Sequence, residues 1–128
     1  MISDLRPYLN RPDILSETAK QVIKDFGMTG MEIKFSGNAD NAYRELFLQI
    51  LPLIEKMQSE NFQNFYSLMY RIDISELQIK KAVEGSKDKT FSEVVTELIL
   101  QRELLKVVFR RQYSKQFAQI RFLPYSYI

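Results

Sequence analysis

Apolar residues recur at every third or fourth position through most of this sequence, which is the spacing of one face of an α-helix. The pattern predicts helices over approximately residues 12–26, 40–57, 62–72, 75–84 and 91–117. Their apolar stripes include Leu15, Ala19, Val22 and Phe26; Tyr43, Leu46, Phe47, Ile50, Ile54 and Met57; and Phe62, Phe65, Leu68, Met69 and Ile72. Pro12 suits the first turn of the first helix, and we expect Gly27 to form its left-handed cap.

The last helix is the longest, because neither glycine nor proline interrupts the chain between Thr90 and Pro124. Thr90 and Glu93 are spaced as a capping box, in which each side chain binds the backbone N–H of the other residue. Over residues 91–109 apolar residues lie on several sides of the helix, a pattern typical of a buried central helix. We therefore predict an all-α fold, a four- or five-helix bundle that forms a single domain (residues 1–128) around a long central C-terminal helix.

Three segments leave alternatives open. Pro52 lies inside the second helical pattern, where it removes a backbone donor and either kinks or ends the helix. The stretch Met31–Ser36 alternates apolar and polar residues, as a half-buried strand does, but it has no partner strand. We expect an extended connector there, with a short strand as the alternative. Residues 59–61 form either a turn or the middle of a bent helix.

The segment Leu68–Val83 resembles a helix-turn-helix motif. Its second helix begins with a capping box at Ser75–Gln78, and in such a motif Lys80 and Lys81 would enter the major groove of DNA. However, Asp73 occupies the turn position where glycine is usual. We therefore favour an ordinary hairpin of two bundle helices over a DNA-binding motif.

The composition excludes most familiar catalytic sites. The chain has no cysteine and no histidine, so it cannot form disulfides, catalytic triads or most zinc sites. No glycine-rich phosphate loop is present either. We expect a protein that is not an enzyme, with no cofactor and no metal ion.

Basic residues are concentrated after residue 101, where six bases accompany one acid, whereas the rest of the chain has twelve bases and fifteen acids. Bases interleaved with aromatic residues can bind phosphates and stack on unpaired bases of nucleic acid. The alternative is a solvated helix face whose aromatic residues lie in the core. The candidate interaction surface comprises Arg102, Lys106, Arg110, Arg111, Tyr113, Lys115, Phe117, Arg121, Tyr125 and Tyr127.

The two ends of the chain differ in character. Residues 1–11 form an N-terminal arm without the basic start and apolar run of a secretion signal. Residues 122–128 are apolar, and we expect this tail to dock on the bundle or on a partner. No stretch approaches the roughly 18 uninterrupted apolar residues of a membrane span. We therefore expect a cytoplasmic protein without membrane contact.

Two short stretches, Tyr70–Glu76 and Glu97–Lys106, resemble a family of small uncharacterised helical proteins of Bacteroidetes. The resemblance extends over Leu68–Tyr113, under half of the chain. It implies a cytoplasmic helical domain and carries no activity, cofactor or catalytic residue.

The leading functional hypothesis is a non-enzymatic protein-interaction module that binds a protein partner or forms a homodimer. Its basis is the lack of catalytic residue types together with the excess of apolar residues on the long helix and in the tail. The alternative is a nucleic-acid-binding protein that uses either residues 68–83 or the basic end of the C-terminal helix.

Overall fold

The computed structural model describes residues 5–119, with side chains through Ser114. Within these residues the chain forms five α-helices and no β-strand, which confirms the predicted all-α fold. The elements are η1 (Arg6–Tyr8), α1 (Pro12–Gly27), η2 (Ala39–Asn41), α2 (Ala42–Glu60), α3 (Phe62–Ile72), α4 (Glu76–Glu84) and α5 (Phe91–Gln119).

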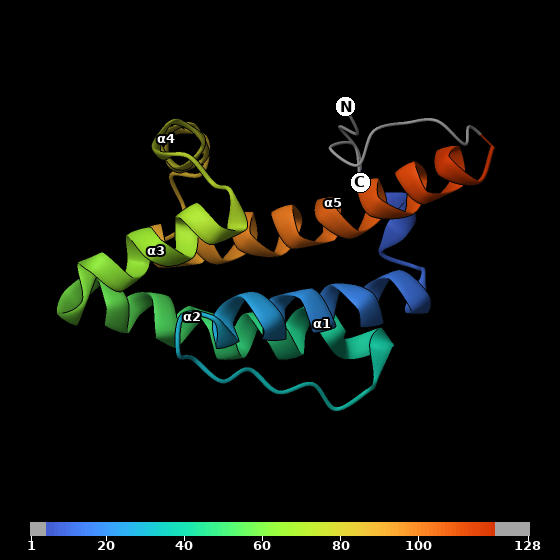
Figure 1. The fold of residues 1–128 in the computed structure, drawn as a ribbon. Coiled ribbons are helices and arrows are strands. Elements are labelled where there is room, and N and C mark those ends of the chain that lie inside the picture. The colour runs from blue at the N-terminus through green and yellow to red at the C-terminus, as the bar shows by residue number, and fades with distance from the viewer. Residues whose placement is uncertain (1–4, 120–128) are drawn as a thin grey trace.

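The helices are arranged around α5. Helices α1 and α2 lie side by side in one layer, and α5 crosses over them with α3 next to its first half (Figure 1). Helix α4 stands apart on the outer side and contacts α5. Because α5 contacts each of the other four α-helices, the predicted central role of the long C-terminal helix is confirmed.

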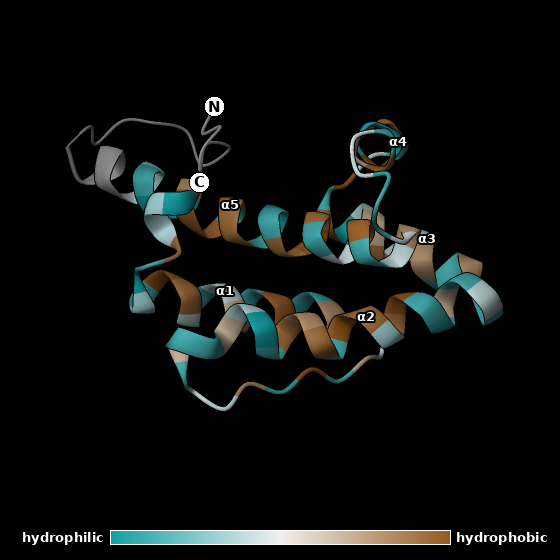
Figure 2. Cartoon of the chain, turned by 180° about the vertical axis from the view of Figure 1, so that it is seen from behind, coloured by the Kyte–Doolittle hydropathy of each residue, from teal (hydrophilic) through white to brown (hydrophobic). Residues whose placement is uncertain are grey.

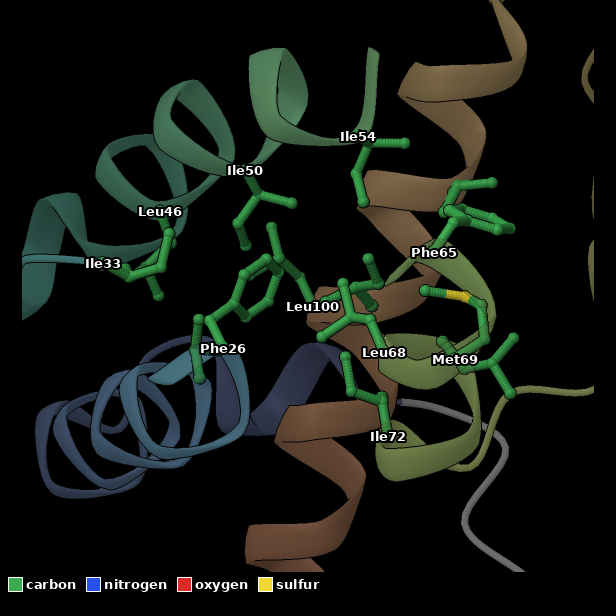
Figure 3. Packing of buried hydrophobic residues seen from close by; sticks show 14 of the residues in the cluster. Phe26, Ile33, Leu46, Ile50, Ile54, Phe65, Leu68, Met69, Ile72 and Leu100 are labelled. Carbon is green, nitrogen blue, oxygen red and sulfur yellow. The ribbon is translucent and has the colours of Figure 1, made fainter. Parts of the chain in front are cut away.

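The main core lies where α1, α2, α3 and α5 meet. Figure 3 shows Phe26, Ile50 and Leu68 pointing toward one another from three of these helices, with Leu100 between them. Phe26, Ile50 and Leu68 are completely buried. Burying a side chain of this size contributes about 1.5–3 kcal/mol. Along α5, hydrophobic and polar residues are interspersed (Figure 2), as expected for a helix that packs on several neighbours.

Both predicted capping boxes are present. The backbone N–H of Ser75 donates to Gln78 Oε1 at 2.8 Å, and that of Gln78 donates to Ser75 Oγ at 3.1 Å. At the start of α5, the N–H of Thr90 donates to Glu93 Oε1 at 2.9 Å, and that of Glu93 donates to Thr90 Oγ1 at 3.2 Å. These bonds satisfy helix-terminal donors that would otherwise lack partners, and they fix where α4 and α5 begin.

The interruption in the long helical pattern falls at Asn61 rather than at Pro52. Helix α2 continues through Pro52 and ends at Glu60. Asn61 leaves the helical region at φ −150° and ψ 75°, and its side chain accepts a hydrogen bond from the Asn64 N–H at 3.1 Å. One residue therefore closes α2 and caps α3, and residues 59–61 are a helix boundary.

Residues Met31–Ser36 form an extended connector, as expected, and not a strand. The connector runs along the side of the α1–α2 layer that faces away from α5 (Figure 1). Ile33 is buried, while the Gln49 amide bonds both backbone groups of Lys34, accepting at 2.9 Å and donating at 2.7 Å. A side chain of α2 thus takes the place of a neighbouring strand.

The predicted left-handed cap at Gly27 is wrong. Gly27 is the last residue of α1, and Met28 follows it with right-handed helical angles. The left-handed position is Gly30, at φ +82°. The chain stays helical for longer than the pattern indicated, because Met28 and Thr29 still bond to carbonyls of the last turn.

Candidate interaction groove

Helix α3 carries two rows of large apolar residues. Phe65, Met69 and Ile72 face the core and are buried. Beside them Phe62, Tyr66 and Tyr70, spaced four residues apart, are 52%, 51% and 90% exposed. Residues four apart lie above one another on a helix, so the second row forms a continuous aromatic ridge that the bundle leaves uncovered.

The turn after α3 places α4 across the end of this ridge. Asp73 adopts a left-handed conformation, with φ 72° and ψ 54°, and its N–H bonds the Met69 carbonyl at 2.9 Å. The N–H of Ile74 bonds the same carbonyl at 2.9 Å. Both bonds close the helix end, and buried Ile74 then leads directly into the cap of α4.

An open groove of about 420 Å³ lies between α3, α4 and the start of α5. Its size falls within the range of sites that bind small molecules or short peptide segments. We call this feature the aromatic groove. It is lined by Phe62, Phe65, Tyr66, Met69, Tyr70, Ile74, Ser75, Glu76, Ile79 and Phe91.

The rings of the groove support one another. The Phe62 ring lies 5.4 Å from Tyr66 and 5.9 Å from Phe65, measured between centroids. Phe65 in turn lies 6.3 Å from Phe91 of α5. These separations are typical of attractive aromatic pairs, so the wall of the groove is held by contacts between α3 and α5.

The groove is apolar and weakly acidic. Besides the hydroxyl groups of Tyr66 and Tyr70, its polar side chains are Ser75 and Glu76, at the start of α4. Among the described lining residues none is basic. The groove therefore favours an apolar ligand without negative charge, since no basic side chain among the lining residues could pair with an acid.

The sequence-predicted basic residues of α5 lie elsewhere, mainly against α1. Arg111 Nη1 contacts Asp13 Oδ2 at 2.6 Å, and its Nη2 contacts Glu17 Oε1 at 3.3 Å. Arg110 donates two hydrogen bonds to Gln21 Oε1, each 3.1 Å long. The guanidinium groups of Arg11 and Arg111 also hold the pKa of Asp13 below its usual value.

These contacts form an ordered polar interface that we call the α1–α5 seam. On α1 it comprises Asp13, Glu17, Gln21 and Asp25, and on α5 Lys106, Arg110 and Arg111. The α1 members are spaced by four residues and share one face of the helix. Because the two helices run in opposite directions, each base meets an acid or amide.

The inner end of the seam is buried. Asp25 is 2% exposed and contacts Arg71 Nε at 3.1 Å and Lys106 Nζ at 3.2 Å. Glu103 is completely buried, with its Oε1 3.0 Å from Lys106 Nζ. Burial and the neighbouring carboxylate of Asp25 raise the pKa of Glu103 to about 8.

Asp25 keeps the negative charge of this carboxyl pair. Burial alone would raise its pKa, but hydrogen bonds from Glu103 and Gln21 and the charge of Lys106 outweigh burial and lower it. At neutral pH, Glu103 is therefore mostly protonated and donates to the Asp25 carboxylate. Since Glu103 has no exposed surface, the pair lies inside the packing of α1 on α5 and is not accessible to a substrate.

The remaining predicted surface residues are dispersed. Arg102 contacts Asp73 at 2.6 Å, beside the α3–α4 turn. Tyr113 is half-buried, with its ring 6.2 Å from that of Phe109. The side chains of Lys115 and Phe117, and all of Arg121, Tyr125 and Tyr127, lie outside the described residues.

Helix α4, the second helix of the helix-turn-helix-like segment, exposes both of its lysines. Lys80 and Lys81 are both exposed on α4, whereas the neighbouring Ile79 faces the core and the groove.

Among the described residues no cluster of three or more potential metal ligands occurs. Within the same part of the chain, no helix combines the length and apolar character needed to cross a bilayer.

Sequence reasoning missed both the groove and the buried carboxyl pair. Phe62 and Phe91 belong to apolar stripes and were expected in the core, although an aromatic row at Phe62, Tyr66 and Tyr70 was visible in the spacing. The acidic row at residues 13, 17 and 25 was equally visible. Such rows become informative only when the opposing surface is known.

Comparison with known proteins does not identify a relative of this chain. No protein-family model, curated protein or solved structure matches the chain. The resemblance of residues 68–113 to helical proteins of Bacteroidetes therefore stays a prediction.

Proposed function

We propose that this chain is a non-enzymatic protein-interaction module whose aromatic groove binds an apolar, aromatic segment of a protein partner. The observation that carries the proposal is the exposed row of Phe62, Tyr66 and Tyr70 along a groove of about 420 Å³. Tyrosine and other aromatic residues are enriched at protein interfaces, where a rigid ring contributes a large contact area at low entropic cost.

The properties of the groove favour a peptide segment over other ligands. Its ring-lined wall and near absence of charge suit apolar side chains, while Ser75 and Glu76 offer polar groups at one edge. Many proteins recognise a peptide by binding several of its apolar side chains in a groove between helices. We expect affinities in the micromolar range, because the contact is small compared with a standard protein interface.

The distribution of charge disfavours the nucleic-acid alternative. Arg102, Arg110 and Arg111 each contact a carboxylate of the same chain, so their charge is partly neutralised before any ligand approaches. Nucleic-acid affinity depends on bases that are free to replace the counterions of phosphates. A cytoplasmic location is part of the proposal, and the absence of cysteine is consistent with it.

Selection from a library of random nine-residue peptides, displayed on phage, tests the proposal. We expect enriched peptides to be rich in aromatic and aliphatic residues and poor in acids. Their binding, measured by calorimetry with synthetic peptides, should weaken at least tenfold in Tyr66→Lys, which places a charge in the aromatic row. Chemical shifts of groove residues should change on titration.

Leu48→Lys is the matched control. Leu48 is 58% exposed on α2, close to the 51% of Tyr66, and it does not line the groove. This variant should bind the selected peptides as the wild type does. The proposal is overturned if no peptide is enriched, or if Tyr66→Lys and Leu48→Lys bind the enriched peptides equally well.

A further inference from the structure

We propose that the segment bound in the aromatic groove is residues 120–128 of a second copy of the chain, exchanged reciprocally in a two-fold dimer. This inference rests on the proposed function, since it names the partner of the same groove. Two observations support it: the complementary character of the segment and the groove, and the distance between them in one chain.

The segment matches the groove in side-chain chemistry. Residues 120–128 consist of Ile120, Arg121, Phe122, Leu123, Pro124, Tyr125, Ser126, Tyr127 and Ile128. They include three aromatic rings, one base and no acidic side chain. The groove presents aromatic rings, one acid and no base. Arg121 and Glu76 are thus the complementary charges of an otherwise apolar contact.

The segment is too far from the groove of its own chain to fill it. Arg102 and Asp73 are in contact, so the near edge of the groove lies level with Arg102 on α5. At 1.5 Å per residue, Gln119 is about 26 Å from that level and about 42 Å from Phe91. A fully extended chain advances at most about 3.6 Å per residue, so residues 120–128 span at most about 32 Å. The end of the segment could reach the near edge of its own groove, but not the part beside Phe91.

In a dimer, residues 120–128 of one copy can lie next to the groove of the other copy. Two copies with antiparallel α5 helices place the end of each α5 beside the groove of the other copy. Because the same two surfaces meet twice, the arrangement closes as a two-fold dimer and leaves neither groove open. The alternative head-to-tail arrangement would leave one groove and one segment unfilled, and it would grow into longer assemblies.

Sedimentation and light scattering of the full chain provide the first test. We expect a mass of about 30 kDa, twice the 15.2 kDa of one chain, at micromolar concentration. The double substitution Tyr125→Ser and Tyr127→Ser should raise the dimer dissociation constant at least tenfold, and Tyr66→Lys should do the same. Leu48→Lys should leave it unchanged.

Mixing the two weakened proteins gives a signature that a structural role would not produce. The tail variant retains an intact groove, and Tyr66→Lys retains an intact tail. An equimolar mixture should therefore form a heterodimer held by one intact contact, with a dissociation constant below that of either variant alone. Each variant should keep the helical circular dichroism and the unfolding midpoint of the monomeric wild type.

A charge cycle tests the register of the segment. If Arg121 contacts Glu76 of the other copy, Arg121→Gln and Glu76→Gln should each weaken the dimer about two- to fivefold, and the double variant should be no weaker than either single variant. If the two increases in dissociation constant multiply in the double variant, Arg121 and Glu76 do not contact each other, and this pairing is overturned.

The outcomes separate this inference from the proposed function. A monomer at high concentration, a dimer that survives both Tyr66→Lys and the tail substitutions, or assemblies that grow with concentration would each overturn the exchanged dimer. A synthetic peptide of residues 120–128 that fails to shift groove resonances would do the same. If peptides selected from the library still bind the groove in those cases, the interaction module stands with another partner.

Discussion

The α1–α5 seam and the aromatic groove lie at opposite ends of the same long helix, and they differ in what completes them. In the seam, each base of α5 meets a carboxylate or amide supplied by α1. In the groove, the rings of Phe62, Tyr66 and Phe91 remain substantially exposed, and no segment among residues 5–119 covers them.

This contrast reverses the expectation from residue type alone. Charged residues on a helix usually face solvent, and aromatic residues usually lie in the core. Here the charged face is matched inside the chain, while part of the aromatic face remains available. A surface is a candidate for binding when its own chain leaves it incomplete, whatever its polarity.

The largest effect is expected at the inner end of the seam. Removing the carboxylate in Asp25→Ala leaves Lys106 and Arg71 without their shared partner. Breaking a buried ion pair on one side costs about 3–5 kcal/mol of unfolding free energy. Urea denaturation followed by circular dichroism measures this loss.

Asp13→Ala is the control for this prediction, because Asp13 belongs to the same row but lies at the exposed end of the seam. We expect a much smaller change there, since exposed ion pairs are screened by solvent. Equal losses of unfolding free energy in the two variants would show that burial does not set how much each ion pair of the seam contributes to stability.

The second effect is a pH dependence that originates at Glu103. Its ordinary pKa is 4.5, and in the folded protein burial raises the pKa to about 8. Between these values the folded state binds a proton that the unfolded state releases, so stability decreases as pH rises from about 4.5 and levels off above about 8. Each pKa unit corresponds to about 1.4 kcal/mol, which limits the total to several kcal/mol.

Glu103→Gln should remove this dependence, because the amide keeps a donor toward Asp25 but does not titrate. The urea midpoint of Glu103→Gln should therefore be nearly constant between about pH 5 and pH 9 and exceed that of the wild type at the alkaline end. Asp25, whose pKa is lowered, keeps its negative charge over this range. An unchanged slope in the variant would contradict the assignment to Glu103.

The third effect concerns the turn that shapes the groove. Asp73 has a positive φ of 72°, a conformation that costs a residue with a Cβ roughly 1–2 kcal/mol relative to glycine. Asp73→Gly and Asp73→Ala both lose the 2.6 Å contact with Arg102. The glycine variant should therefore be more stable than the alanine variant by about 1 kcal/mol, as measured by thermal unfolding. Equal stabilities would indicate that the turn relaxes when the side chain is shortened.

The smallest effect on stability is expected in the groove itself. Tyr70 is 90% exposed, so Tyr70→Ser should change the unfolding free energy by no more than about 0.5 kcal/mol. The same variant should bind groove peptides more weakly than the wild type does. A loss well above 1 kcal/mol in urea denaturation would mean that the ring stabilises the fold, and it would weaken the contrast with the seam.

Most of the fold could be predicted from the sequence because its elements are encoded locally. The period of three to four residues identified the helices, and Ser75 and Thr90 marked the first residues of the last two through short-range hydrogen bonds. The break at Asn61 was less predictable, since the apolar stripe continues across it and only the backbone angles at that residue interrupt it.

The candidate site was harder to predict because it depends on which surfaces face each other. Periodicity shows that Phe62 and Phe65 are both apolar positions of one helix, but only packing shows that Phe65 is covered and Phe62 is not. The bases of α5 are a similar case. Their positions in the helix were predicted, whereas their partners on α1 lie almost one hundred residues earlier in the chain.

The hydrogen bonds between Gln49 and Lys34 have a consequence for association between chains. An extended segment with unpaired backbone groups is a template on which strands of other molecules can add. Here Gln49 occupies the N–H and the carbonyl of Lys34, and Glu45 binds the N–H of Ser36 on the same edge. These two side chains of α2 block that edge against β-sheet aggregation, which protects an alternating, β-prone stretch that lies between helices.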